Sequence, residues 1–593
     1  MSSNFSHPPP SSNSAAIAAA AAAKKSMAVR AVQQRNNEKT AKYYAAAMAG
    51  LIVVFTLFHW SRFLYSRYAT KGLRKSKLMK AQVSLARLFR HFLNRRLPGF
   101  TSLGHALLVA IYLAINIILT VTNNDFSIIS VGKRLGWMAI LNVCFITFLA
   151  LKNTPLAFLT AYSYESLNPL HQIGGYTTIT CALLHATLQC VYFQQENMLS
   201  ELREEAQFYG MTAVAAFFVI LVTAIAVRKL RYELFYVIHI TMYMLIIIMV
   251  ALHRPEFATK SVIITIVAGS MWGLDRVLRG SRILYNSINN QATIYPLPNG
   301  GTRIVLRRSP SRTVPGTHCF LWIPKIRLIE THPFTIVSAT PTSLDLVIAA
   351  YDGFTNDLHQ YAVKNPGVSL RASIDGPYGA LPNFAKVADK VILIAGGSGA
   401  SFTFGVALDM ISKVSDSSNL SIDFIWTVRE QENLSWFREE LNELQSSPRV
   451  RLFLHTTRPS PPPPKDSESE APTPLISRAN SEKRPFPPSQ TARSSSTNQE
   501  TPDTDVEKNG KRSAATAHAT SPWESSASLN VAHGRPDVDA LIRDVVAKAD
   551  REERITVAAC GPDDLMGIVR RSAASCISVS GASIELHCEQ FGW

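Results

Sequence analysis

The sequence predicts a multi-pass α-helical membrane domain followed by a soluble region that combines a small antiparallel β-barrel with a parallel α/β domain. Apolar runs of membrane length crowd into residues 44–278, and short β-rich stretches alternate with Pro and Gly over 285–385. Apolar strands and a Gly-rich turn follow from residue 386. Composition agrees, because 47% of the 593 residues are hydrophobic and only 17% are charged, with a mean hydropathy of +0.08.

The boundaries follow from shifts in composition. We expect a disordered Ser, Pro, Ala and Asn-rich tail over 1–42, a seven-span membrane domain over 43–282, the β-barrel over 285–385, and the α/β domain over 386–593. Lysines follow the Ala-rich run of the tail, whereas a signal peptide carries its charge first. Residues 459–545 are dominated by Pro, Ser, Thr and charge, so they are predicted to be a disordered insertion.

The predicted spans are helices, because lipid offers no hydrogen-bond partner and the backbone groups must bond to one another within the span. They lie near 44–65, 102–122, 135–151, 170–193, 210–227, 234–253 and 258–278.

Basic residues set the predicted orientation, since Lys and Arg gather in cytoplasmic loops. They cluster over 67–96, 228–231 and 276–282, while the loop over 196–205 is acidic. We therefore expect the N-terminus outside and everything after about residue 283 in the cytosol, although the tail itself is basic. This placement explains much of the net charge of +17, so no nucleic-acid role is expected. Seven cysteines without a CxxC pair exclude a disulfide scaffold and a cysteine-ligated metal cluster.

Four histidines stand inside the predicted spans, where an ionisable side chain is costly and indicates function. They are His171 and His185 in the fourth span and His239 and His253 in the sixth. Each pair is 14 residues apart, which puts both imidazoles within about 40° on one helix face and about 21 Å apart along the axis. Buried histidines that only form hydrogen bonds are the alternative.

Imidazole is a good iron ligand, so this pattern predicts two bis-histidine haems of the b type. Both helices are predicted to run in the same direction, which pairs His171 with His239 and His185 with His253. Six-coordinate iron leaves one-electron transfer as its chemistry.

An ordered series of motifs follows in the soluble region. The motifs are His332-Pro333-Phe334-Thr335, Gly353-Phe354-Thr355, Asp375-Gly376-Pro377-Tyr378-Gly379, Gly396-Gly397-Ser398-Gly399, Cys560-Gly561-Pro562 and Glu589-Gln590-Phe591-Gly592-Trp593. Together with the histidine pairs, the series resembles the fungal-type ferric-chelate reductases of the flavocytochrome superfamily, which includes the NADPH oxidases. The resemblance covers residues 130–458 and 546–593 and implies a ferredoxin-reductase-like soluble unit that binds FAD and NADPH.

The resemblance also implies roles for these residues. His332 to Thr335, with Gly376 and Pro377, would line the flavin, and Gly353 and Thr355 would bind the FAD pyrophosphate beside an unfavourable Asp352. Gly396, Gly397 and Gly399 would let the backbone approach the nicotinamide cofactor's diphosphate. Cys560 and Gly561 would lie at the nicotinamide edge, and Phe591 and Trp593 would cover the flavin. A tight turn, a small core residue and ordinary aromatic packing are the respective alternatives.

Arg429 follows a buried strand and could clamp a 2′-phosphate, although a solvated surface arginine fits the sequence nearly as well. With the resemblance, it favours NADPH. No residue is predicted to be catalytic in its own right.

The implied reaction carries electrons across a bounding membrane, for which the plasma membrane is expected, to extracellular ferric or cupric chelates for metal uptake. A metal permease or oxidase partner is conceivable but is not identified by any residue. Dioxygen reduction to superoxide is one alternative function, and a seven-span receptor or transporter without redox chemistry is another.

Overall fold

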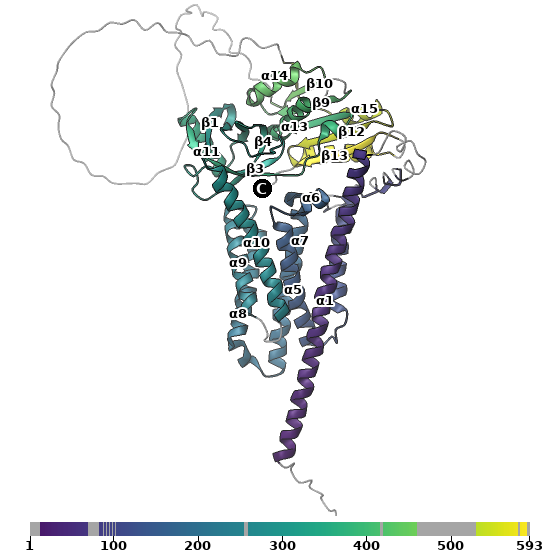
Figure 1. Ribbon diagram of the computed structural model, residues 1–593, viewed down its shortest axis with the longest axis vertical. Helices are drawn as coiled ribbons and strands as arrows, with labels where there is room; N and C mark the ends of the chain where they lie inside the picture. Colours follow the sequence, from purple (N-terminus) through teal and green to yellow (C-terminus); the bar gives the residue numbers. More distant parts are fainter. Residues whose placement is uncertain are drawn as a thin grey trace, which may run out of the picture. The chain divides into compact units, whose positions relative to one another are not determined.

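The computed structural model describes residues 12–68, 102–253, 259–414, 419–458, 529–578 and 581–589, and scattered positions between 82 and 100. Long helices come first, and two β-sheets follow them in the chain (Figure 1). The fold class predicted from the sequence, apolar helices followed by an antiparallel and then a parallel α/β domain, is confirmed.

Seven long helices lie among the residues described in the first part of the chain. Their bounds are α1 Ser12–Tyr68, α4 Leu103–Val121, α5 Ile128–Ala150, α7 Tyr164–Gln195, α8 Glu205–Val222, α9 Tyr232–Leu252 and α10 Thr259–Asn286. Short helical segments lie between them at α6 Leu156–Thr160, η1 Leu199–Arg203 and η2 Thr223–Val227. Among the described residues, every long helix except α7 is long and apolar enough to cross a membrane.

The predicted span 170–193 lies in α7, which is therefore the exception. This helix carries polar side chains such as Gln172 and Thr178, and the latter is fully buried. α7 packs along the length of α5 and also contacts α8 (Figure 1). A helix that faces other helices needs less apolar surface than one that faces lipid, which explains its composition.

Helix α1 corrects the prediction of a disordered tail over 1–42. The helix begins at Ser12, so residues 12–42 are its first part, while residues 1–11 lie outside the described residues. The run Ala15–Ala23 consists almost entirely of the best helix former, and no proline occurs between Ser12 and Tyr68. The low hydrophobicity of the segment indicated disorder, but its helix propensity is high.

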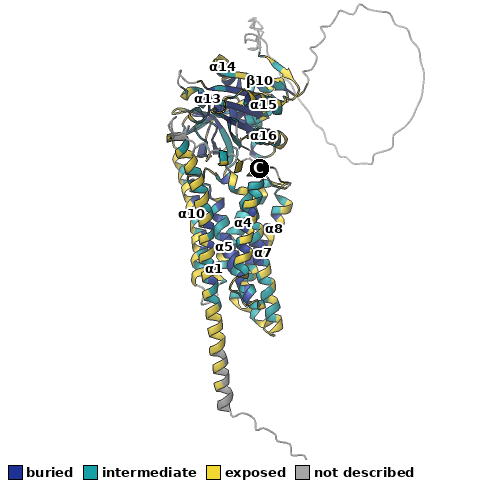
Figure 2. Cartoon of the chain, turned by 90° about the vertical axis from the view of Figure 1, so that its right-hand side faces the viewer, coloured by how far each residue is buried: buried dark blue, intermediate teal, exposed yellow. Residues whose placement is uncertain are grey.

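A polar network is buried within the helix bundle. The Tyr44 and Tyr112 hydroxyls both donate to Asn142 Oδ1, at 2.7 and 2.5 Å, and the Asn142 amide donates to Asn116 Oδ1 at 2.7 Å. These bonds join α1, α4 and α5, and all four side chains are buried. Much of α1 is otherwise exposed (Figure 2). Fully paired polar groups of this kind fix how apolar helices pack against one another.

The first sheet is antiparallel and has seven strands in the order β6-β1-β2-β5-β4-β3-β7. The strands are β1 Gln291–Leu297, β2 Gly301–Leu306, β3 His318–Trp322, β4 His332–Thr340, β5 Ser343–Ala349, β6 Ser369–Arg371 and β7 Ser373–Tyr378. Helix α11, Phe354–Lys364, and the alternate apolar residues of these strands form its core.

The second sheet is parallel and has six strands in the order β11-β10-β9-β8-β12-β13. The strands are β8 Lys390–Gly396, β9 Ser421–Val428, β10 Val450–Thr456, β11 Val531–His533, β12 Arg554–Cys560 and β13 Ser583–Glu589. The helices of this domain are α12 Phe384–Val387, α13 Ala400–Lys413, α14 Arg438–Ser446, α15 Val538–Ala547 and α16 Asp563–Ser575. Because β9 to β11 extend to one side of β8 and β12 lies on the other, the strand order reverses between β8 and β12.

The predicted insertion 459–545 lies for the most part outside the described residues. Its last part is a correction, because β11 begins at Val531 and α15 begins at Val538. The three residues of β11 pair with the end of β10, and α15 buries Val538, Ile542 and Val545. Residues 538–547 have an amphipathic helical pattern, but the Pro and Ser-rich composition of the preceding segment placed them in the predicted insertion.

Candidate redox site

The four membrane histidines form two pairs across α7 and α9. The ring centroids of His171 and His239 are 6.2 Å apart, and those of His185 and His253 are also 6.2 Å apart. An imidazole nitrogen lies about 1.1 Å from its ring centroid and about 2.0 Å from a bound transition metal, so two rings on one iron need roughly 6 Å. The spacing of both pairs therefore fits one metal ion between the rings of each pair.

Backbone carbonyls fix three of these rings. The Nδ1 atoms of His171, His185 and His253 lie 3.0, 2.7 and 2.6 Å from the carbonyl oxygens of Ile146, Gly132 and Ala206. A carbonyl oxygen only accepts, so Nδ1 carries the proton and Nε2 keeps the lone pair that a metal needs. The Nδ1 atom of His239 is buried without a hydrogen-bond partner among the described residues.

Two glycines make room for the histidines distant from the sheets. A Cβ at Gly136 would lie 3.1 Å from the His185 ring, and a Cβ at Gly210 would lie 2.6 Å from the His253 ring. Neither these glycines nor the carbonyl acceptors are predicted from the sequence. A glycine within an apolar span is the only signal they give, and that signal does not identify the ring it accommodates.

The predicted flavin residues His332, Pro333, Phe334 and Thr335 lie on β4, next to β3. The rings of His332 and Phe334 both stack on Phe354, with centroids 4.3 and 6.1 Å apart. Thr335 lies directly opposite His318 of β3, so both side chains are on the other face of the sheet. The motif therefore presents different residues to the two faces.

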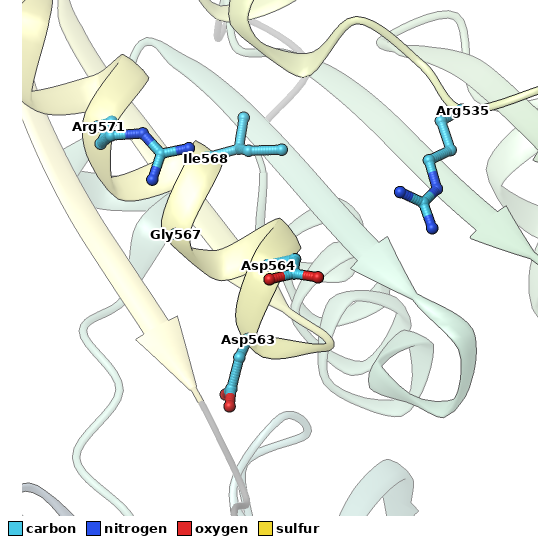
Figure 3. Close-up of a pocket in the computed structure, with 6 residues that line it drawn as sticks. All are labelled: Arg535, Asp563, Asp564, Gly567, Ile568 and Arg571. Carbon is cyan, nitrogen blue, oxygen red and sulfur yellow. The ribbon is translucent and has the colours of Figure 1, made fainter.

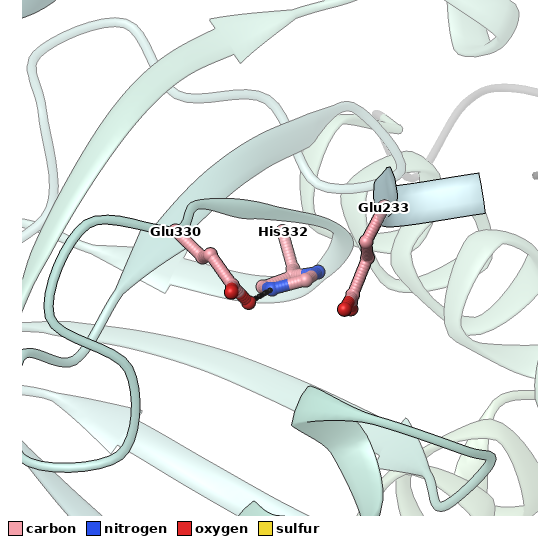
Figure 4. A group of neighbouring side chains, drawn as sticks. All are labelled: Glu233, Glu330 and His332. Atoms are coloured by element: carbon pink, nitrogen blue, oxygen red, sulfur yellow. Dashed lines mark hydrogen bonds and ion pairs between the residues drawn. The ribbon is translucent and has the colours of Figure 1, made fainter. Parts of the chain in front are cut away.

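The predicted pyrophosphate residues Gly353 and Thr355 lie at the start of α11. Gly353 has a positive φ of 75°, and its missing Cβ would lie 3.0 Å from the Glu233 carboxylate of α9. Glu233, Glu330 and His332 each bring a possible ligand atom into a group whose atoms lie within 4.8 Å of one another (Figure 4). The glycine and the helix N-terminus fit a phosphate, but the two carboxylates oppose its charge.

Gly376 and Pro377 lie on β7, next to Asp375, whose carboxylate forms ion pairs with helix α10. Asp375 is fully buried, and its oxygens lie 2.6 Å from Arg279 Nε and 3.1 Å from Arg282 Nε. Both arginines belong to the end of α10. These ion pairs attach the predicted flavin-binding strand to the helix bundle.

The predicted nucleotide residues meet where the strand order reverses. Gly396 ends β8, and Gly397 and Gly399 follow it. Cys560 ends β12, which pairs with β8, and Gly561 follows it. A Cβ at Gly396 would lie 2.8 Å from Pro562, and one at Gly399 would overlap the Cys560 carbonyl. These two glycines therefore let the segments after β8 and β12 pack closely, while a Cβ at Gly397 would meet nothing within 4 Å. Ligands of open α/β sheets bind in the crevice at this switch point, so a dinucleotide would lie here.

A pocket of about 350 Å³ opens beside α16 (Figure 3). Its lining residues are Arg535, Asp563, Asp564, Gly567, Ile568 and Arg571. Two carboxylates and two guanidinium groups balance each other, so the lining residues do not by themselves indicate an anion site.

The remaining predicted residues lie apart from this pocket. Arg429 is exposed at the carboxyl end of β9. Phe591 and Trp593 lie outside the described residues.

An interdomain triad, not predicted from the sequence, consists of Tyr164, Glu165 and His318. His318 Nε2 lies 2.7 Å from Glu165 Oε1 and 3.0 Å from the Tyr164 hydroxyl, which joins the start of α7 to β3. Burial alone would raise the pKa of Glu165, but the interaction with His318 outweighs it and holds the pKa at about 2. Burial and the Glu165 charge raise the pKa of Glu589, opposite Cys560, to about 7.

The fold and this site define a membrane oxidoreductase with flavin-binding and nicotinamide-binding domains. Comparison with known families agrees domain by domain: residues 135–250 match the ferric reductase like transmembrane component, 288–382 an FAD-binding domain and 388–574 the ferric reductase NAD binding domain. The chain is a ferric reductase-like transmembrane flavoenzyme.

Curated fungal proteins are similar to it at modest identity. A ferric/cupric reductase transmembrane component 2 of Schizosaccharomyces pombe is 26% identical over 396 residues, covering 57% of this chain and 68% of that protein. A probable cell surface ferric reductase of Aspergillus oryzae is 27% identical over 389 residues, covering 58% and 50%. A ferric/cupric reductase transmembrane component 1 of Candida albicans is 24% identical over 315 residues, covering 52% and 40%. The chain thus spans half or less of the length of two of these three relatives.

Proposed function

We propose that this protein passes electrons from cytosolic NADPH across the plasma membrane to ferric or cupric chelates on the other side. When bound, NADPH and FAD would supply hydride transfer, and two b-type haems would supply one-electron transfer. The observation that carries the proposal is the equal spacing of the two histidine pairs, 6.2 Å in each. The names of the fungal relatives support the choice of metal chelates as acceptors.

The membrane histidines would hold the two metal ions at different depths. His171 and His239 would hold the one nearer the sheets, because α7 starts at the interdomain triad only seven residues before His171. His185 and His253 would hold the other, about 21 Å further along the helices. That separation bridges most of a hydrocarbon core of about 30 Å.

The soluble residues would bind and orient the two nucleotides. The β4 motif and the start of α11 would receive FAD, and the glycines after β8 would receive the NADPH diphosphate. Arg429 would favour NADPH over NADH by pairing with the 2′-phosphate, since it is exposed at the carboxyl end of β9. Cys560 would lie at the nicotinamide edge, where its buried thiol stays protonated because burial raises its pKa to about 12.

Orientation in the membrane gives the reaction its direction. With the N-terminus outside and the sheets in the cytosol, electrons move outward, and a potential that is negative inside favours this by about 2.3 kcal/mol per charge per 100 mV. The acceptor would then be reduced outside the cell, where an insoluble or chelated metal must be released before uptake.

Sealed inside-out membrane vesicles test this function. NADPH added outside the vesicles should reduce a ferric chelate trapped inside them, and a ferrous indicator in the lumen should report it. Superoxide dismutase in the lumen should leave the signal unchanged. A signal abolished by dismutase would instead support dioxygen as the acceptor, and absence of any NADPH-dependent reduction would contradict electron transfer. NADH in place of NADPH measures donor preference.

A further inference from the structure

His318 is held in place by residues of another domain. Its Nε2 atom lies 2.7 Å from the Glu165 carboxylate and 3.0 Å from the Tyr164 hydroxyl, and its side chain is only 5% exposed. Its other ring nitrogen, Nδ1, turns toward Gly379, 3.8 Å from where a Cβ of that glycine would lie. A carboxylate on one nitrogen of an imidazole fixes the tautomer and stabilises the protonated ring.

The imidazole of His318 also borders the predicted flavin motif. His318 faces Thr335 directly across β3 and β4, and residues in such opposed positions have Cβ atoms about 5 Å apart on one face of the sheet. Tyr378 belongs to the second predicted flavin motif, Asp375 to Gly379. Its ring stacks on the imidazole, with centroids 5.9 Å apart and an interplanar angle of 27°. The histidine therefore lies between both flavin motifs and the start of the helix that carries His171.

The proposed reaction leaves one proton that must be removed at this place. A hydride from NADPH brings two electrons and one proton to the flavin. Two ferric haem irons take one electron each, so the flavin returns to its oxidised form and one proton is left over. A buried flavin needs a nearby group to accept that proton.

The other ionisable groups around the triad are engaged by neighbouring side chains. Asp375 is held by two arginines, Arg279 and Arg282. Lys152, whose pKa is lowered by burial, lies over the faces of Tyr164 and Phe320, at 4.3 and 3.7 Å from their centroids. Burial raises the pKa values of Tyr164 and Tyr378, so both phenols stay protonated. Burial and the charge of Glu165 raise the pKa of Glu589, at the end of β13, to about 7, so this carboxyl can exchange a proton near neutral pH.

We propose that His318, oriented by Glu165, accepts the proton that remains when the two electrons of the hydride leave the flavin one at a time. This inference rests on the proposed function. Nδ1 of His318 receives the proton, and the Glu165 carboxylate stabilises the imidazolium that forms. The proton would leave toward the cytosolic side, with Glu589 as the neighbouring carboxyl.

The test uses the full-length protein with its cofactors and the variants His318→Gln and Glu165→Gln. A glutamine at 318 keeps a polar partner for Glu165 but cannot take up a proton. After anaerobic mixing with NADPH, bleaching of the flavin should be unchanged in both variants, because hydride transfer releases no proton. The haem reduction that follows should slow by about 10²-fold in His318→Gln and by about tenfold in Glu165→Gln. His359→Gln is the matched control, since His359 belongs to α11 and bonds Thr302 at 3.1 Å.

An equilibrium readout separates proton acceptance from a structural role. The flavin midpoint potential plotted against pH should have a different slope in His318→Gln than in the unmutated protein, because the variant lacks the group that takes up the proton. Haem reduction within about twofold of the unmutated rate in both variants, or the same slope in His318→Gln and the unmutated protein, would overturn the inference. If His318→Gln does not retain FAD, Glu165→Gln alone decides by the same two measurements. An unmutated protein without flavin or haem signals would contradict the proposed function instead.

Discussion

The rings of His185 and His253 lie 6.2 Å apart, and a backbone carbonyl of a neighbouring helix contacts the Nδ1 atom of each ring. Their Nδ1 atoms face the carbonyl oxygens of Gly132 and Ala206, at 2.7 and 2.6 Å. The two acceptors belong to α5 and α8, the helices next to the two that carry the histidines. The geometry of the pair is thus set by the packing of α5 on α7 and of α8 on α9.

Gly210→Ala should remove the metal site of this pair and leave the other pair intact. The new Cβ would lie 2.6 Å from the His253 ring, which must move. Alanine is the better helix former, so the helix itself should not weaken. We expect the haem content per polypeptide to fall by about half.

Gly273→Ala is the control for that variant, because nothing lies within 4 Å of a Cβ at this position of α10. Its haem content should match the unmutated protein. Equal haem content in Gly210→Ala and the unmutated protein would mean that His253 is not confined as the structure indicates.

Asp375→Asn should destabilise the attachment of the first sheet to α10. The substitution leaves Arg279, which is 8% exposed, without its carboxylate, and breaking a buried ion pair costs about 3 kcal/mol or more. We expect a lower unfolding midpoint and easier loss of FAD, measured by the release of flavin fluorescence on heating.

Asp539→Asn provides the comparison, because Asp539 pairs with Arg543 on the exposed surface of α15. Surface pairs contribute little to stability, so this variant should unfold like the unmutated protein. Identical unfolding of the two variants would show that Asp375 is not an anchor.

Stability should fall as the pH rises from about 4.5 to about 7, through the ionisation of Glu589. Burial and the charge of Glu165 raise the pKa of this carboxyl to about 7 in the folded protein, above its ordinary value of 4.5. In this window the folded state holds a proton that the unfolded state has lost, so stability decreases with pH and is level above it.

Glu589→Gln should remove this dependence and stabilise the protein at pH 8 by roughly 3 kcal/mol. Unfolding midpoints of both proteins over a pH series measure the difference. Parallel curves for the two proteins would contradict the prediction.

Glu233→Gln should tighten FAD binding. The Glu233 carboxylate lies next to Gly353, at the predicted pyrophosphate site: a Cβ built on Gly353 would be 3.0 Å from it. Removing an exposed like charge near a phosphate should lower the dissociation constant by roughly two- to fivefold. Fluorescence titration of the FAD-depleted protein checks this, with Glu432→Gln on the exposed surface as the control, and weaker binding in Glu233→Gln would place the pyrophosphate elsewhere.

The shared helix face of two histidines could be predicted from the sequence, because helix periodicity depends only on their spacing in the chain. A separation of 14 residues within one apolar helix is enough to put His171 and His185 on one face. The strands and the Gly-rich turn after β8 were likewise predictable from alternation and from turn residues.

Contacts between distant segments were not predictable from a single sequence. Glu165 and His318 meet only because α7 starts against β3, and nothing near either residue in the sequence indicates the other. The same holds for Gly210 and His253. The error over 12–42 had a different cause, since composition was taken as evidence of disorder in a segment with high helix propensity.

The central claim is that four imidazoles hold two metal centres one above the other, and the haem content of the purified protein tests it most directly. We predict two b-type haems per polypeptide, with low-spin bis-histidine spectra. His171→Ala and His185→Ala should each leave about one haem, and His171→Ala with His185→Ala should leave none. A protein that binds no haem, or that keeps two haems in either single variant, would contradict the account.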